Sequence, residues 1–199
     1  MSIKLALIRA RTRRSLRRFL ADKRGVSAVE FAMVLPLMVT LYLGGVEVSS
    51  AVAIDRKMTL VARTIGDLTA QATSVSDSDM NNIKAAATAV IAPFDDTKLG
   101  ITISSVIIDA QKVAKIKWSD RNASGNPHIA GEVVPTSLLP ATLRESATYP
   151  IYLIWAEASY AYTPTIGYII TGTKNLTDQL YMRSRLSDCV LRAGVQTVC

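Results

Sequence analysis

The sequence is poor in the residues from which metal sites and nucleophilic sites are built. Its 199 residues include one histidine, His128, and two cysteines, Cys189 and Cys199. A zinc site built mainly from Cys and His needs four converging ligands, so this supply argues against one. No G-x-S-x-G, P-loop, H-E-x-x-H or C-x-x-C motif occurs. We therefore expect no metal, no cofactor and no enzymatic activity, although carboxylate pairs distant in sequence remain an open alternative.

Excess positive charge is absent from most of the chain. The formal net charge is +7, but residues 1–25 hold nine basic groups and one acid, a local net of +8. The remaining 14 bases and 15 acids almost cancel, to a net of −1. The total charge would suggest nucleic acid as a partner, but a near-neutral body with one basic end does not support that function.

A long apolar run follows the basic end. Residues 26–46 contain one charge, Glu30, and as a helix they would reach about 31 Å, roughly one hydrocarbon thickness. Basic residues stay on the cytoplasmic side, so the N-terminus is expected inside and the remainder outside. A secretory signal would be shorter and would end at a small-x-small cleavage site. An uncleaved anchor remains an alternative, in which Glu30 is costly unless it reaches water or a partner.

The residues where the basic end meets the apolar run suggest a third interpretation of this segment. Gly25 is followed by four small or apolar residues and then by Glu30 and Phe31. This order resembles the processing site of type IVb prepilins and pseudopilins. The resemblance implies cleavage after Gly25 by prepilin peptidase, with Val26 as the new N-terminus. Glu30 would then pair with the amino terminus of a neighbouring subunit, which offsets its desolvation and sets the axial register.

A longer stretch sharpens this resemblance. The elements are Gly25, Ala28, Val29, Glu30, Phe31, Ala32 and Pro36. Together they resemble TadE-like proteins, minor pseudopilins of the tight-adherence (Flp, type IVb) pilus. The resemblance implies an inner-membrane pilus component whose partners are prepilin peptidase, other pilins and the assembly platform. Pro36 removes a backbone hydrogen bond and is expected to kink the span.

The helix is expected to continue beyond the membrane, over about 27–72. Apolar residues recur there at alternating spacings of three and four: Ala51, Ile54, Met58, Val61, Ile65, Leu68 and Ala72. Such a stripe is typical of a core-facing helix. A second helix is predicted over Met80 to Ile91, ended by Pro93. The pair Asp95-Asp96 is interpreted as a capping loop rather than an acid–base or metal site.

The C-terminal half is expected to form strands. Leu99 to Ile108, Lys112 to Ser119 and Thr148 to Tyr162 are rich in β-branched and aromatic residues, and the first two should form a hairpin. The predicted fold class is α+β: a long N-terminal helix followed by a small pilin-like periplasmic domain with an antiparallel sheet. The expected divisions are a leader (1–25), a span (26–46), a helix continuation (47–72) and the domain (73–199). The aromatics of the third strand are expected to fill a core.

The last third carries further expectations. Tyr160, Tyr162, Pro164, Arg183 and Arg185 stand where TadE-like proteins have Y-x-Y-x-P, then an apolar helix-like stretch, then R-x-R. His128, with no second ligand near it in sequence, is expected to be structural. In the oxidising periplasm Cys189 and Cys199 should form a disulfide, with free thiols as the rival.

Two functions of different classes follow. The first is a minor pseudopilin that is cleaved after Gly25, supports pilus biogenesis and surface adhesion, and has no substrate of its own. The alternative is an uncleaved membrane-anchored periplasmic binding module or enzyme.

Overall fold

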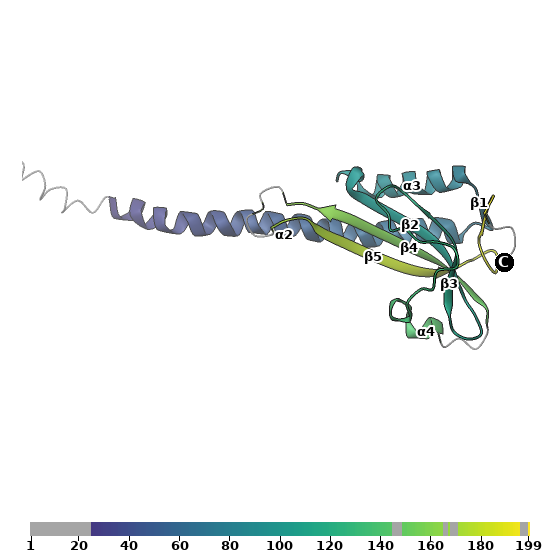
Figure 1. Ribbon diagram of the computed structural model, residues 1–199. Helices are drawn as coiled ribbons and strands as arrows, with labels where there is room; N and C mark the ends of the chain where they lie inside the picture. Colours follow the sequence, from purple (N-terminus) through teal and green to yellow (C-terminus); the bar gives the residue numbers. More distant parts are fainter. Residues whose placement is uncertain (1–24, 145–148, 165–166, 168–170, 196–198) are drawn as a thin grey trace, which may run out of the picture. The chain divides into compact units, whose positions relative to one another are not determined.

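A computed structural model describes residues 25–144, 149–164, 167, 171–195 and 199. The chain divides into two units, Met1–Val46 and Glu47–Cys199, and each is considered by itself. One helix, α2 (Val26–Ala70), belongs to both. The predicted helix over 27–72 is therefore confirmed, with an end two residues earlier than expected. The expected α+β class with an antiparallel sheet is also confirmed (Figure 1).

The second half of α2 buries the predicted apolar stripe, with one correction. Ile54, Met58, Val61 and Ile65 are at most 2% exposed, but Leu68 is exposed and Thr69 is buried instead. Leu68 and Thr69 lie three and four positions after Ile65, so either could continue the stripe. In the structure Thr69 is the one that faces the core. Thr69 satisfies its buried hydroxyl by donating to the Ile65 carbonyl at 2.7 Å.

The second helix, α3 (Asp77–Ile91), begins earlier than predicted because a capping box starts it. The Asp79 backbone N–H donates to Ser76 Oγ at 3.2 Å, and the Ser76 N–H donates to the Asp79 carboxylate at 2.9 Å. These bonds satisfy two donors that a helix start leaves free. They also hold the pKa of Asp79 below its ordinary value.

Lys57 of α2 ties down the other end of α3. Its ammonium donates to the carbonyls of Val90 and Ala92 at 2.7 and 2.6 Å. A cation at this position satisfies carbonyls that have no partner inside the helix and opposes the negative end of its dipole.

Four antiparallel strands form the main sheet in the order β3-β2-β4-β5. They are β2 (Leu99–Ile108), β3 (Ala114–Arg121), β4 (Ile151–Tyr162) and β5 (Lys174–Arg183). The predicted hairpin is β2–β3, although β3 begins and ends two residues later than expected. Sequence analysis placed a strand over 148–162, and β4 occupies its described part. No strand was predicted over the range of β5, residues 174–183.

A register shift explains why the apolar residues of β3 fall out of phase. Trp118 lies opposite Ser105, whereas Ile116 lies opposite Val106, so Lys117 is an extra residue on β3. Such a bulge turns the strand, and side chains on its two sides reach opposite faces. Accordingly Trp118 lies in the core beneath the helices and Ile116 lies in the core on the other face.

The two faces of the sheet have different covers. The helical face packs on α3 and the second half of α2 and buries Ile101, Ile154, Tyr160 and their neighbours (Figure 1). The opposite face is covered by the connection from β3 to β4, which holds η3 (Thr136–Leu138) and α4 (Ala141–Arg144). We call residues 122–144 the excursion. Gly100 lets the excursion lie flat, because a Cβ there would meet the Ser124 carbonyl oxygen at 2.4 Å.

The described C-terminal residues, 184–195 and 199, follow β5, and we call them the strap. Its strand β6 (Leu191–Arg192) pairs in parallel with β1 (Ser74–Val75) between the two helices. The chain between α3 and β2 contains η2 (Asp96–Lys98), which Asp95 caps by accepting from the Thr97 N–H at 3.0 Å. The interpretation of Asp95-Asp96 as a capping loop is confirmed.

Candidate functional site: the apolar N-terminal helix

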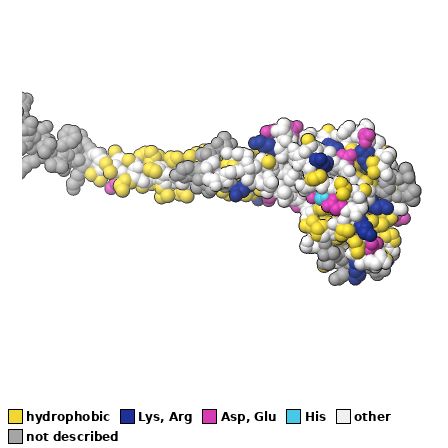
Figure 2. Space-filling model, viewed as in Figure 1, with side chains coloured by type: hydrophobic (Ala, Val, Ile, Leu, Met, Phe, Trp, Pro, Cys, Tyr) yellow, Lys and Arg dark blue, Asp and Glu magenta, His cyan; other side chains and the backbone are white. Residues whose placement is uncertain are grey.

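The first part of α2, residues 26–46, presents an uncovered apolar surface. Apart from Leu43, which is half-buried, its large hydrophobic side chains range from 42% exposed at Leu35 to 77% exposed at Met33. Figure 2 shows these side chains in yellow along the helix, with a single acidic group near its start. By length and composition this segment can cross a membrane. An exposed apolar surface of this extent is typical of segments that contact lipid or other apolar helices.

The residues expected to direct processing and register lie together at the start of this helix. Gly25 immediately precedes it, and a Cβ added at Gly25 would meet nothing within 4 Å. Val26 and Phe31 are 51% and 61% exposed, and Glu30 is exposed between them in sequence. Among the described residues nothing forms a hydrogen bond or ion pair with the Glu30 carboxylate. The Glu30 side chain is therefore not committed to any part of the chain that the structure describes.

Pro36 lies inside the helix without ending it. The helix continues through Pro36 to Ala70, and Thr40 Oγ1 donates to the Pro36 carbonyl oxygen at 2.8 Å. A Thr hydroxyl that bonds back to the fourth residue before it satisfies itself without water, which suits an apolar environment. The expected kink at Pro36 stays a prediction.

Comparison with protein-family models finds a match to the apolar part of this helix and the residues that follow it. Residues 25–66 match the model of TadE-like proteins. This N-terminal segment is TadE-like. The match starts at Gly25, and it indicates a component related to the tight-adherence pilus, as the sequence analysis expected. Searches of the curated proteins and of the solved structures find no match to the chain.

The TadE-like segment extends beyond the exposed helix into the second unit, where it packs on the sheet. At Gly66 an added Cβ would meet Ala156 Cβ at 3.2 Å and Met182 Sδ at 3.3 Å. Glycine thus allows α2 to approach β4 and β5 closely. The second part of the family match is in this way a core element, in contrast with the first.

Two tyrosines singled out from the sequence hold β4 against α2. Tyr160 and Tyr162 are 4% and 7% exposed, and the Tyr162 hydroxyl donates to the Glu47 backbone carbonyl at 3.1 Å. Burial, with the charge of Glu47, raises the pKa of Tyr162. Glu47 itself is 3% exposed. The burial of Glu47 was not predicted. Its only sign in the sequence is its place on α2, four positions before the predicted core stripe.

The two arginines of the R-x-R pattern lie at the far end of α2. The Arg185 backbone N–H donates to the Ala70 carbonyl at 2.9 Å, and the Arg185 guanidinium pairs with Asp67. Arg185 thereby satisfies the last turn of the helix. Arg183 ends β5.

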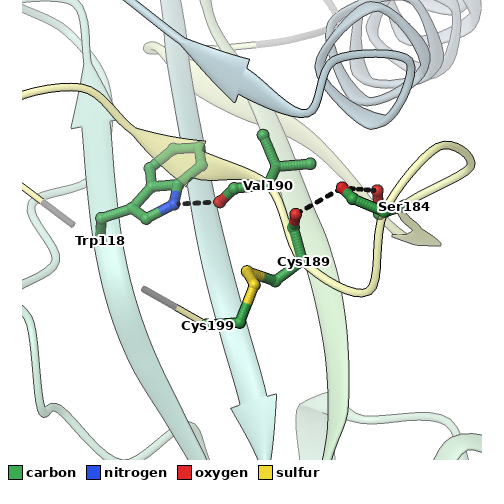
Figure 3. Close-up of a disulfide and its surroundings, with 6 residues drawn as sticks. Trp118, Ser184, Cys189, Val190 and Cys199 are labelled. Atoms are coloured by element: carbon green, nitrogen blue, oxygen red, sulfur yellow. Dashed lines mark hydrogen bonds between the residues drawn. A yellow bond between two sulfur atoms is a disulfide. The ribbon is translucent and has the colours of Figure 1, made fainter. Parts of the chain in front are cut away.

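A disulfide between Cys189 and Cys199 closes the strap (Figure 3). Beside it the Trp118 indole N–H donates to the Val190 carbonyl at 2.8 Å, so the strap bonds directly to β3. Cys189 is 1% exposed. The arrangement gives both cysteines a structural use.

Buried charges join the strap to both layers. Arg192, 7% exposed, donates to Asp120 at 2.7 Å and also to Asp77, while Lys84 of α3 pairs with the same Asp120. Burial alone would raise the pKa of Asp120, but hydrogen bonds from Lys84 and Arg192 outweigh it and lower that pKa. The network connects β6, β3 and α3.

His128 lies on the excursion and contacts two residues of β4, Glu157 and Trp155. Its Nε2 is 2.7 Å from Glu157 Oε2, and its ring lies 4.8 Å from that of Trp155. Trp155 in turn stacks on Tyr181, with ring centres 5.6 Å apart. Among the described residues no three His, Cys, Asp or Glu side chains converge to hold a metal. The cluster fastens the excursion to β4 and β5.

Proposed function

We propose that this protein is a minor pseudopilin of a tight-adherence pilus. In this role it is inserted in the inner membrane with its basic end in the cytoplasm, cleaved between Gly25 and Val26, and recruited to the pilus or to its assembly platform. The domain that follows α2 lies in the periplasm. The observation that carries the proposal is the coincidence at Gly25 of three features: the start of the family match, the end of the basic segment and the start of the apolar helix.

Charge and exposure support the direction of insertion. Nine basic groups within residues 1–25 oppose translocation of that end. The exposed helix after them has the length of a membrane span. Cleavage would remove a net charge of +8 and leave an α-amino group at Val26. Glu30, which no described residue bonds, would then pair with such an amino group on a neighbouring subunit.

The N-terminus of the protein isolated from its own cells tests cleavage directly. Mass spectrometry should find Val26 as the first residue when prepilin peptidase is present and the intact leader when the peptidase gene is deleted. Gly25→Leu should abolish cleavage. Gly45→Leu is the matched control, because an added Cβ at either glycine meets nothing within 4 Å. An intact leader in cells with active peptidase contradicts the proposal.

Assembly tests the role of Glu30 separately. Glu30→Ala should still insert into the membrane and be cleaved, but it should reduce pilus formation. Phe31→Ala, at the adjacent exposed position, distinguishes loss of the carboxylate from a general defect of the helix surface. Normal piliation by Glu30→Ala would rule out the register role and leave the cleavage proposal intact.

A further inference from the structure

The two cysteines of the strap differ in how far solvent reaches them. Cys189 is 1% exposed, whereas Cys199 is exposed. The disulfide that joins them is the yellow bond in Figure 3. Access to the sulfur is one of the factors that decide which cysteine takes part in thiol–disulfide exchange. The strap therefore offers one reachable sulfur and one hidden sulfur.

Hydrogen bonds hold the backbone at Cys189 without help from the disulfide. The Cys189 carbonyl accepts from Ser187 Oγ at 2.6 Å, and the next carbonyl, that of Val190, accepts from the Trp118 indole N–H at 2.8 Å. Cys199, by contrast, forms no hydrogen bond to any other residue that the structure describes. Of the two cysteines, Cys189 is the one fixed to the domain.

The segment after Cys189 is fastened in the same way. The Leu191 N–H donates to the Thr73 carbonyl at 3.1 Å, and the Ala193 N–H donates to the Val75 carbonyl at 3.0 Å. The Arg192 guanidinium donates to one carboxylate on β3 and to one on α3. Because none of these contacts includes a sulfur atom, we expect the strap to dock on the domain in the reduced chain as well.

A reduced Cys189 is compatible with this docked strap. A free cysteine behaves as a small hydrophobic residue and is commonly buried. The neighbouring Val190 and Trp118 side chains lie in the core beneath the helices. Buried structural thiols are inert, whereas reactive thiols are at least partly exposed. In the reduced chain, Cys199 should therefore react first.

We propose that Cys199 is the residue at which a thiol–disulfide oxidoreductase forms a mixed disulfide with this chain, and that Cys189 resolves it. The strap docks first, and the disulfide closes afterwards. The presence of such an oxidoreductase around the domain rests on the proposed function, which places the domain in the oxidising periplasm. The order in which the two sulfurs react rests on the geometry of the strap.

The exchange has two steps. The Cys199 thiolate attacks one sulfur of the disulfide in the oxidoreductase, so that a mixed disulfide forms and one thiolate of the oxidoreductase leaves. The Cys189 thiolate then attacks Cys199 Sγ, which forms the Cys189–Cys199 bond and releases the second thiolate. The chain loses two electrons and two protons, and the oxidoreductase gains them as its disulfide becomes a dithiol.

A pulse of iodoacetamide on the reduced full chain in detergent micelles tests the order of reactivity. Tryptic cleavage after Arg192 separates the two cysteines, so mass spectrometry measures each labelling rate. Cys199 should be labelled at least about tenfold faster than Cys189, because labelling of a buried thiol waits for local opening. In urea that unfolds the chain, the two rates should become similar. Equal labelling without urea, or a difference that persists in urea, would overturn the proposal.

Two single variants test the mixed disulfide, with oxidised glutathione as the probe. Cys189→Ser leaves the reachable sulfur without its partner and should accumulate a glutathione adduct at Cys199. Cys199→Ser is the matched control, and its adduct at Cys189 should form at least about tenfold more slowly. Equal rates in the two variants would overturn the assignment of Cys199 as the reacting residue.

The same variants identify the partner in cells. Cys189→Ser should be joined through Cys199 to a protein with a C-x-x-C site, in a complex that reductant removes, and Cys199→Ser should yield less of it. A chain joined only to glutathione would overturn the assignment of a protein partner. The N-terminus is measured in the same samples. A Cys199 complex on a chain with an intact leader would refute the proposed cleavage alone, whereas a cleaved N-terminus with no complex would refute this inference alone.

Discussion

The two parts of α2 belong to one helix and yet have opposite surroundings. In residues 26–46 the large apolar side chains other than Leu43 are 42–77% exposed. In residues 47–70, by contrast, Ile54, Met58 and Ile65 are at most 2% exposed. The first part is also the more apolar, with one charged residue against six in residues 47–70. The two parts also differ in their partners among the described residues: the sheet covers one face of the second part, and no described segment covers the first. The same helix therefore has a core-facing part and a part whose apolar side chains no described segment covers.

Two methionines on α2 provide the sharpest contrast between its parts. Met58 is 0% exposed and Met38 is 56% exposed. Met58→Ala should lower the free energy of unfolding of the domain by about 2–5 kcal/mol, because it leaves a cavity against the sheet. Met38→Ala should change it by less than about 0.5 kcal/mol. Denaturant titration of the full chain in micelles, followed by the fluorescence of Trp118 and Trp155, measures both.

The contrast would break if the two substitutions had equal effects. Equal destabilisation would mean that residues 26–46 contribute to the stability of the domain. Equal neutrality would mean that α2 is not part of its core. The matched residue type removes differences in side-chain size and helix propensity between the two sites.

The strap supplies the next largest effect. Opening the disulfide with the pair Cys189→Ser and Cys199→Ser should cost about 2–3 kcal/mol, since the bond closes a loop of about ten residues in the unfolded chain. Reduction of the native protein should give the same loss, and the double variant should then be insensitive to reductant. An unchanged unfolding midpoint in reductant would contradict a stabilising role. Because Trp118 and Arg192 hold the strap independently, the β1–β6 pairing should survive.

The buried charges of the domain predict a pH dependence. The folded pKa of Asp120 is lowered, so its contribution is fully present above its unfolded pKa of about 3.9 and is lost as pH falls through the folded pKa. Asp120→Asn should cost about 2 kcal/mol at pH 7, because hydrogen bonds from two cations are weakened. It should also flatten the fall in stability below pH of about 4. Asp55→Asn, at an exposed site on α2, should reproduce the native profile, and an equal change in both variants would contradict this account.

Most helices and strands could be predicted from local sequence patterns, but β5 and the strap could not. The helices and the β2–β3 hairpin follow from periodicity and turn residues, because those signals are written in adjacent residues. β5 was missed since its sequence, with Asn175, Asp178 and Gln179, is too polar to read as a strand. A half-exposed edge strand needs few apolar residues. The pairing of β5 with β4 is a tertiary contact between segments that local sequence does not reveal. The strap was missed for the same reason: two-residue strands have no local signal.

The candidate site shows the opposite balance. Gly25, Glu30 and Pro36 were evident from sequence because their spacing in one segment carries the resemblance. Glu47 was not, since its burial depends on Tyr162, which lies 115 residues away. Likewise the capping of β3 by residues 131–134 depends on where the excursion folds back. A motif within one segment can be recognised from the sequence alone, whereas the burial of Glu47 can be recognised only once the tertiary contacts are known.

The smallest expected effect lies where α2 supports α3. Lys57→Met keeps the aliphatic stem but removes the ammonium that bonds the Val90 and Ala92 carbonyls. The loss should be about 1 kcal/mol, because both carbonyls lie at the helix end and can be hydrated in its absence. Arg56→Met, at the neighbouring exposed position on α2, should be within about 0.5 kcal/mol of the native protein. Amide exchange in the last turn of α3 should accelerate in Lys57→Met alone, and equal acceleration in both variants would show that the bonds to Lys57 do not hold that turn.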